Sequence, residues 1–250
     1  RWDINGTLSR NRIKNYVGYV SNYDADTWDD LYSQTAVEKL AAEFGTPLLV
    51  LSLKEVKKSY NVLRKYLPRV KVHYAIKANP HPEILRVMAE LGSCFDVASD
   101  GEIHTLHDMG VAGSRMIYAN PVKLGVGLEA CRQCGVSKMT FDSASEIEKI
   151  KNKLPHATVL LRLRIDNSSA HVDLNKKFGA SRDNALELML KAKEAGLDMA
   201  GIAFHVGSQT VSSDPYLYAM DIARELFEEA EAAGLHLRIL DIGGGFPIPE

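Results

Sequence analysis

A lysine placed after a short apolar run is the first residue in this 250-residue chain that is suited to chemistry. Lys77 ends the run HYAIK and precedes Ala78-Asn79-Pro80. A lysine amine that is shielded from water has a lowered pKa, and its neutral form can attack a carbonyl carbon to give a Schiff base. The alternative is a lysine at a strand end that reaches solvent, and position alone leaves both interpretations open.

An imidazole and a glycine triplet follow two later apolar runs. His205 follows GIAF, where its ring is suited to stacking on a flat ligand or to proton transfer, or is simply a satisfied core histidine. Ser208, in the same segment, is suited to donating to an anion or to capping a turn. The triplet Gly243-Gly244-Gly245 allows positive φ and close approach of backbone N–H groups to a phosphate. A tight turn without a ligand is the alternative, since the sequence contains neither a P-loop nor a Rossmann fingerprint.

Charged and polar side chains end several other apolar runs. Asp96 and Arg162 are candidates to point inward, although a structural ion pair would also explain them. The other residues of this kind are Ser99, Asn120, Asp142 and Asp166. The histidines form no convincing metal-ligand set, because His104 and His107 are expected on one solvated helix face, and we expect no metal site.

Strands are needed to bring these side chains together, and eight β-rich apolar runs have strand length. The runs are continuous rather than alternating, which is typical of parallel strands buried on both faces. They cover residues 48–53, 70–77, 94–99, 115–120, 138–143, 158–165, 199–208 and 237–243. In folds of this type, functional residues gather at the carboxyl ends of the strands.

Helix start and stop signals lie between these runs. Capping boxes of the S/T-x-x-E type occur at Ser52/Glu55, Ser99/Glu102, Ser143/Glu146 and Thr35/Glu38. Glycines that follow helical stretches are Gly45, Gly92, Gly110, Gly135, Gly196 and Gly234. The regular alternation of strand and helix predicts an α/β barrel or a doubly wound sheet.

Composition restricts the class of protein. Lys and Arg number 30 against 32 Asp and Glu, a net charge of −2, which argues against a nucleic-acid partner. No apolar run approaches the roughly 18 residues of a membrane span. Three cysteines indicate reduced thiols and a cytoplasmic protein. Cys131 and Cys134 form a C-x-x-C inside a helical stretch, where we expect two thiols one turn apart rather than a redox or zinc site.

The chain divides into two predicted parts. Residues 1–45 are irregular and rich in aromatic residues, and they are expected to form a separate N-terminal segment. Residues 46–250 carry the repeating units and are expected to form the barrel. Neither Arg1 nor Glu250 is typical of a natural terminus, so we expect a fragment of a longer chain.

The motifs taken together resemble those of the fold-type III, pyridoxal-phosphate-dependent decarboxylases of basic amino acids. Ornithine decarboxylase and the bacterial lysine/ornithine decarboxylases are the most similar members. The matching motifs are YAIKAN (74–79), FDVAS (95–99), MIYANPVK (116–123), TFDS (140–143), LLRLRIDNSSA (160–170), LNKKFGA (174–180), FHVGSQ (204–209) and LDIGGGFP (240–247).

The resemblance implies an α/β fold, a TIM-like (β/α)8 barrel that is incomplete here. It lacks its last strand and the family's C-terminal β domain, with which residues 1–45 would pack. The run 48–53 would then lie at the domain junction, which leaves seven barrel strands.

The resemblance also implies residue roles around a pyridoxal 5'-phosphate cofactor. Lys77 and His205 would be catalytic, with Lys77 holding the cofactor through a Schiff base and His205 stacking on its ring. Ser208 and the glycine triplet would bind the phosphate. The full set of implied cofactor-binding residues is Lys77, Asp96, Arg162, His205, Ser208, Gly243, Gly244 and Gly245. Lys177 would reach the partner subunit of a homodimer whose active site lies at the subunit interface.

The implied activity is decarboxylation of L-lysine, L-ornithine or both to cadaverine and putrescine, in polyamine biosynthesis. Four alternatives remain open. The first is a non-catalytic paralogue similar to antizyme inhibitor, and the second is a diaminopimelate or arginine decarboxylase. A cofactor-free Schiff-base aldolase and an enzyme similar to alanine racemase fit the phosphate-binding triplet and the FHVGSQ motif less well.

Overall fold

The computed structural model describes residues 34–165 and 178–247, which fall into two compact units, residues 1–70 and 71–250. The described part of the first unit contains helices α3 (Gln34–Phe44) and α4 (Leu53–Tyr66). The Ser52/Glu55 cap is confirmed, because the Glu55 N–H donates to Ser52 Oγ at 3.3 Å. The predicted Thr35 cap is wrong, since Thr35 lies within α3.

The apolar run 48–53 does not form a strand. Residues 48–52 have no regular structure, and Leu53 begins α4. The physical reason is local: the Ser52 cap satisfies an N–H group of the first helical turn, and the following LKEVKKSYNVLRKY is amphipathic at helical spacing. The run is therefore not a barrel strand. This agrees with the family layout, which placed the run outside the barrel strands, at the domain junction.

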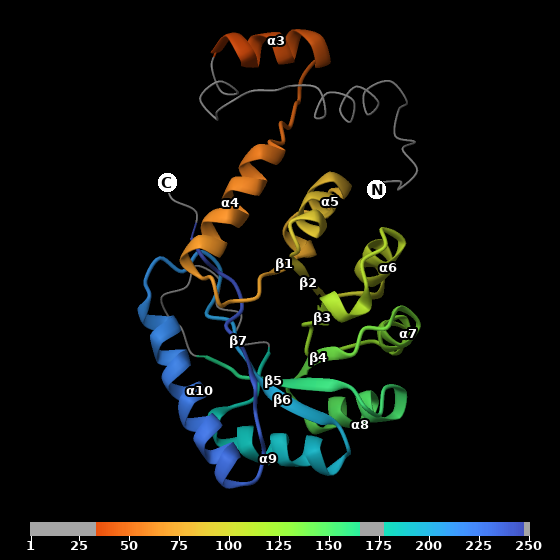
Figure 1. Ribbon diagram of the computed structural model, residues 1–250, viewed down its shortest axis with the longest axis vertical. Helices are drawn as coiled ribbons and strands as arrows, with labels where there is room; N and C mark the ends of the chain where they lie inside the picture. The colour runs from red at the N-terminus through yellow and green to blue at the C-terminus, as the bar shows by residue number, and fades with distance from the viewer. Residues whose placement is uncertain (1–33, 166–177, 248–250) are drawn as a thin grey trace. The chain divides into compact units, whose positions relative to one another are not determined.

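The second unit, here called the barrel unit, is a sheet of seven parallel strands in chain order (Figure 1). The strands are β1 (His73–Ala75), β2 (Cys94–Val97), β3 (Met116–Tyr118), β4 (Lys138–Phe141), β5 (Thr158–Arg162), β6 (Asp198–Ala203) and β7 (Ile239–Asp241). Among the described residues, β1 and β7 each pair on one side only. This arrangement confirms the predicted incomplete barrel of seven strands.

Helices connect successive strands and lie outside the curled sheet in Figure 1. They are α5 (Pro82–Glu90), α6 (Asp100–Asp108), α7 (Gly125–Cys134), α8 (Ala144–Lys153), α9 (Arg182–Glu194) and α10 (Asp214–Ala232), with short 3-10 turns η1 (Ile76–Ala78) and η2 (Gly113–Arg115). The predicted stop glycines are confirmed by positive φ at Gly45, Gly92, Gly110, Gly135, Gly196 and Gly234.

The two faces of the sheet carry different side chains. Alternate residues of a strand point to opposite faces, and paired residues of parallel neighbours share a face. Phe95 and Val97 are fully buried on one face. Asp96 lies between them and pairs with Ile117, so it shares the opposite face. That inner face holds a small core of Ile117, Leu160, Ala203 and Ile239.

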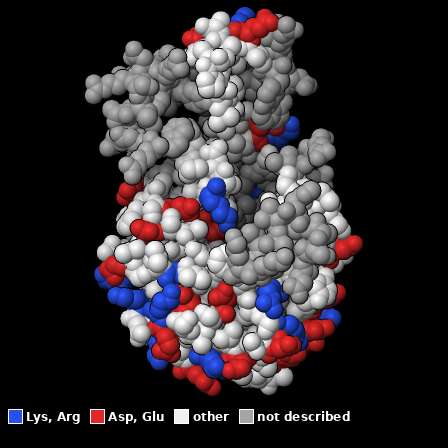
Figure 2. Space-filling view, turned by 180° about the vertical axis from the view of Figure 1, so that it is seen from behind, with Lys and Arg blue, Asp and Glu red and all other residues white. Residues whose placement is uncertain are grey.

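Charges on the barrel unit are mixed. Figure 2 shows basic and acidic side chains interspersed on the visible face without a large patch of one sign. The mixed charges on this face agree with the net charge of −2. None of the helices in the described ranges has both the length and the apolar character needed to span a membrane.

Gly201 in β6 provides a test of the strand packing. A Cβ at this buried position would lie 1.8 Å from the Ile239 carbonyl oxygen of β7. Gly201→Ala should therefore lower the free energy of unfolding by about 1–3 kcal/mol, through separation of β6 from β7. Urea unfolding measures the change.

Gly125→Ala is the matched control, because a Cβ at this position of α7 meets no atom within 4 Å. Alanine favours helix over glycine, so this variant should be as stable as the wild type or more stable by up to about 1 kcal/mol. Equal effects of the two substitutions would contradict the close packing of β6 on β7.

Candidate active site

Lys77 and Asp96 meet at the carboxyl ends of β1 and β2. The Lys77 ammonium lies 3.7 Å from Asp96 Oδ2. Lys77 lies in the 3-10 turn that follows β1 rather than in the strand itself, and 60% of its side chain is exposed, so its amine is open to a ligand. The prediction that these two strand ends converge is confirmed.

The Asp96 carboxyl titrates well above the usual range for aspartate. Burial raises its pKa to about 6, and the neighbouring Lys77 ammonium opposes that change. The carboxylates of Asp241 and Glu102 act in the same direction as burial, and the value of about 6 includes their effect. Asp96 therefore exchanges a proton near neutral pH, as a group that donates to or accepts from a ligand must do.

Arg162 ends β5 and belongs to the same electrostatic group. Burial lowers its pKa, while the carboxylates of Asp142, Asp96 and Asp241 raise it. Its guanidinium carbon lies 5.4 Å from the centre of the Phe178 ring, a cation–π contact. Arg162 is thus a desolvated cation among three carboxylates, and it faces the interior as predicted.

His205 follows β6, and its ring orientation is fixed. The Gly207 N–H donates to His205 Nδ1 at 2.9 Å, which assigns the proton of the neutral imidazole to Nε2. Burial is the main cause that lowers the pKa of His205 to about 4, and the positive charges of Arg162 and Lys77 contribute to this value. The ring is therefore neutral at physiological pH.

The glycine triplet packs directly against the His205 segment. A Cβ at Gly243 would lie 2.3 Å from the Phe204 carbonyl oxygen, and one at Gly245 would lie 1.8 Å from that of Gly207. Both glycines also have positive φ, 67° and 96°, which L side chains rarely adopt. The turn and the His205 segment therefore form one packed unit.

The N–H groups of this turn differ in their partners. The Gly243 N–H donates to Asp241 Oδ1 at 2.8 Å. Within the described part of the chain, the N–H groups of Gly244 and Gly245 have no hydrogen-bond partner. These two groups are therefore available to an anion. Ser208 is exposed three residues after His205, so its predicted contact with a phosphate stays a prediction.

Two of the residues singled out in the sequence, Asp166 and Lys177, lie outside the described residues. Asp142 is described, and it accepts a hydrogen bond from the Gly179 N–H at 2.9 Å. Asp241 was not recognised as a site residue. Its alternating position in β7, two residues after the inward-facing Ile239, is the signal that would have identified it.

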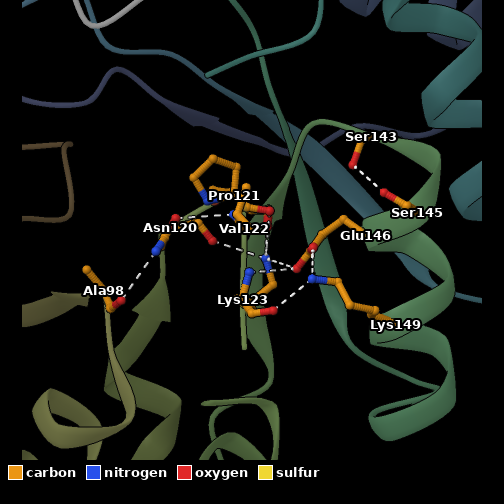
Figure 3. Close-up of polar contacts among 10 residues, drawn as sticks. Ala98, Asn120, Pro121, Val122, Lys123, Ser143, Ser145, Glu146 and Lys149 are labelled. Carbon is orange, nitrogen blue, oxygen red and sulfur yellow. Dashed lines mark hydrogen bonds and ion pairs between the residues drawn. The ribbon is translucent and has the colours of Figure 1, made fainter. Parts of the chain in front are cut away.

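A buried lysine, Lys123, also escaped the sequence analysis. Its side chain is inaccessible to solvent, and its ammonium lies 2.9 Å from Glu146 Oε1 (Figure 3). The ammonium donates to the carbonyl oxygens of Asn120, Pro121 and Thr140 at 3.1, 3.3 and 2.6 Å. Burial lowers the pKa of Lys123, and the Glu146 carboxylate opposes this.

Glu146 completes this network instead of capping α8. Its carboxylate accepts from the Lys123 backbone N–H at 3.1 Å and pairs with the Lys149 ammonium at 2.6 Å. The predicted Ser143/Glu146 capping box is wrong, because the Ser143 side chain makes no capping hydrogen bond. The buried charge of Lys123 requires Glu146 as its partner, and the pair fixes the loop between β3 and α7.

The C-x-x-C cysteines lie on α7, and both are buried, which confirms their expected place in a helix. Burial raises the pKa of Cys131 to about 12, so its thiol is protonated and unreactive. Cys134 Sγ lies 3.7 Å from His104 Nδ1. Within the described ranges, no three His, Cys, Asp or Glu side chains form a cluster suited to a metal ion.

The fold and the site define a class of protein. It is an incomplete parallel α/β barrel whose carboxyl edge holds an exposed amine beside a titrating carboxyl, a neutral imidazole and a glycine turn. Two N–H groups of that turn have no hydrogen-bond partner among the described residues. The chain belongs to the family of pyridoxal-dependent decarboxylases, because its residues 53–250 match the pyridoxal binding domain of that family. The resemblance drawn from the motifs is therefore confirmed, and the cofactor of this family is pyridoxal phosphate.

The matches to individual proteins are consistent with this family assignment. Lysine/ornithine decarboxylase of Selenomonas ruminantium is 53% identical over 218 residues, 87% of this chain and 56% of the relative. Antizyme inhibitor 2 of Xenopus laevis is 38% identical over 221 residues, 88% of this chain and 48% of the relative. The crystal structure of SrLDC in complex with PLP and cadaverine shares 50% identity and a TM-score of 0.82, and it covers 87% of this chain and 55% of that one. The chain thus spans about half the length of these relatives.

The Lys123–Glu146 pair should be essential for stability. Lys123→Met leaves the Glu146 carboxylate without its buried partner, so the free energy of unfolding should fall by about 3–5 kcal/mol, measured by urea unfolding. Lys149→Met is the control, because that ammonium is partly exposed, and its loss should cost less than about 1 kcal/mol. A Lys123→Met protein as stable as the control would contradict the role of this pair.

Asp96 and His205 should make opposite contributions to the pH dependence of stability. The folded-state pKa of Asp96 is raised, so the folded protein binds more protons than the unfolded one between about pH 4 and 6, and stability falls as pH rises. The folded-state pKa of His205 is lowered, so stability rises between about pH 4 and 6.5. Each contribution is roughly 3 kcal/mol when complete.

Single substitutions should separate these two contributions. In urea unfolding of the cofactor-free protein, the free energy of unfolding of Asp96→Asn should rise more between pH 4 and 6.5 than that of the wild type. His205→Gln should lose stability over the same interval, because only the Asp96 contribution remains. Parallel stability profiles for the wild type and both variants would show that these groups titrate normally.

Proposed function

We propose that this chain is the cofactor-binding part of a decarboxylase that acts on L-lysine, L-ornithine or both, and releases the diamine. The observation that carries the proposal is an exposed Lys77 amine paired with Asp96, in a chain 53% identical to a lysine/ornithine decarboxylase. The chain covers about half of that relative, so the proposal concerns the part of such an enzyme that binds the cofactor.

The residues of the site fit pyridoxal phosphate. The free N–H groups of Gly244 and Gly245 suit its phosphate, and space around Gly244 is open, with no atom within 4 Å of a Cβ built there. The neutral His205 ring suits stacking on a flat heterocycle. When bound, pyridoxal phosphate supplies an aldehyde that condenses with amines and a ring that accepts electrons.

Each side chain then has a defined task. Lys77 would hold the aldehyde carbon and give way to the amine of the substrate. Asp96 would pair with the Lys77 ammonium and take up or return a proton near pH 6. His205 would cover one face of the ring without adding a positive charge, because its pKa is about 4. The protein thereby controls orientation and charge.

Arg162 and Ser208 would complete the cofactor site. Arg162 is a desolvated cation beside Asp96, suited to orienting polar groups at the ring edge. Ser208 is exposed in the His205 segment, where its hydroxyl would donate to the phosphate together with the glycine turn.

Substrate choice within the basic amino acids is set by a small energy difference. Lysine and ornithine differ by one methylene, which an apolar pocket discriminates by about 1–3 kcal/mol. Dual use of the two substrates is therefore part of the proposal, in agreement with the name of the bacterial relative. Diaminopimelate and arginine are the alternatives that the assay below must exclude.

Assembly and location complete the proposal. The protein would act as a homodimer with its active site at the subunit interface, which Lys177 would reach. Residues 1–45 would pack with a C-terminal β domain, and residues 46–250 would form the barrel. Three free, buried cysteines are consistent with a reducing cytoplasm.

A specific relative also supports a second candidate, a non-catalytic regulator. Antizyme inhibitor 2 is 38% identical to this chain. The two candidates differ in what they require of the site. A regulator of this kind needs neither the Lys77 amine nor the free N–H groups of the glycine turn, whereas the enzyme needs both.

One experiment on the full-length protein separates these candidates. The purified enzyme should show a visible absorbance band from cofactor bound to a lysine, and it should decarboxylate lysine, ornithine or both. Lys77→Ala should remove the band and lower turnover by at least about 1,000-fold, because the variant lacks the amine that would hold the aldehyde.

Lys71→Ala is the matched control, since Lys71 is an exposed lysine in the same segment, and this variant should keep the band and the activity. A band that persists in Lys77→Ala would assign the cofactor to another lysine. A wild-type protein without any band would favour the regulator, and turnover of diaminopimelate or arginine alone would overturn the proposed substrate.

A further inference from the structure

Asp241 lies in one row with Arg162 across three strands. Arg162 of β5 pairs with Ala203 of β6, and Ala203 pairs with Asp241 of β7. Paired residues of parallel strands point to the same face, so Asp241 and Arg162 share the inner face of the sheet. The small Ala203 side chain between them leaves room for the long arginine and the carboxylate to interact.

The same carboxylate holds the first residue of the glycine turn. Asp241 Oδ1 accepts the Gly243 N–H at 2.8 Å, and the Asp241 carbonyl oxygen accepts the Phe204 N–H at 2.9 Å. Phe204 directly precedes His205. Asp241 therefore ties the glycine turn to the His205 segment through its side chain and its backbone.

Close packing against backbone carbonyls restricts the position of the glycine turn. Gly243 lies against the Phe204 carbonyl and Gly245 against that of Gly207, too close for any side chain. The position of the Gly243 N–H consequently sets the direction of the two N–H groups that follow it. Those of Gly244 and Gly245 have no partner within the described part of the chain.

The charge of Asp241 extends to the other titrating groups of the site. It raises the pKa of the Asp96 carboxyl on β2 and of the Arg162 guanidinium on β5. It also raises the pKa of His73 on β1, against the stronger effect of burial. One carboxylate thus acts on groups from three other strands.

We propose that Asp241 is a positioning residue, which directs the Gly244 and Gly245 N–H groups toward a phosphate. The inference rests on the proposed function, because it concerns the same cofactor site. Asp241 itself does not contact the cofactor. Its carboxylate oxygen is already engaged by Gly243, and a second negative charge next to a phosphate would be unfavourable.

The test compares pyridoxal phosphate with pyridoxal, which lacks the phosphate, in absorbance titrations of the full-length protein. Asp241→Ala removes the acceptor for Gly243 and should weaken pyridoxal phosphate about 10-fold, the effect of one lost hydrogen bond. Its affinity for pyridoxal should change less than about twofold. Asp241→Asn keeps an oxygen acceptor and should bind pyridoxal phosphate within about threefold of the wild type.

Asp221→Ala is the matched control, because Asp221 is an exposed aspartate on α10, and it should change neither affinity. Equal losses for both ligands in Asp241→Ala, or no loss for either, would overturn the inference. If the wild type binds neither ligand, the proposed function itself fails. If the wild type binds pyridoxal phosphate and Asp241→Ala binds it equally well, only the role of Asp241 fails.

A second measurement covers the case in which Asp241→Ala does not fold. In Asp241→Asn, the negative charge is lost while the shape is kept, so Asp96 should titrate at lower pH than in the wild type. Carbon-13 NMR of the cofactor-free protein follows that carboxyl directly. An unchanged Asp96 titration would show that the Asp241 carboxylate does not share the inner face of the sheet with Asp96, and it would overturn the placement on which the proposal rests.

Discussion

The parallel pairing of seven successive strands is the constraint on which the rest of the site depends. Because each strand pairs with the next in chain order, the last inward side chain of each strand arrives at the same edge. Asp96, Arg162 and Asp241 come from strands far apart in sequence, yet the Asp241 carboxylate raises the pKa of both Asp96 and Arg162. The helices contribute by closing the opposite face of the sheet, where Phe95 and Val97 are fully buried.

The pKa values of the groups at this edge depend more on burial than on ion pairing. Burial is the largest cause of the pKa changes of Asp96, Arg162 and His205, and nearby charges only modify it. The result is a carboxyl that is partly protonated near pH 6 and an imidazole that is neutral. Groups in these states exchange protons and stack on rings without strong charge, which suits a site built to handle a cofactor rather than to neutralise an ion.

Local sequence signals predicted the fold well and the polar networks poorly. Apolar runs and stop glycines act through neighbours in sequence, so the seven strands and the six glycines that end helices with positive φ were predictable. The run 48–53 was misassigned because a helix cap competes with strand propensity. Glu146 has the spacing of a cap, but its partner Lys123 lies 23 residues away and becomes visible only in three dimensions. Asp241 escaped notice for the same reason, since its importance depends on register across β5 to β7.

The buried Lys123 has a consequence for engineering this protein. Its two neighbours in sequence, Val122 and Leu124, are 52% and 71% exposed, so buried charge and exposed apolar side chains alternate within three residues. The conformation of the loop is held by the lysine and not by the apolar side chains. Polar replacements at positions 122 and 124 are therefore a route to better solubility that leaves the loop in place, whereas the residue between them tolerates no such change.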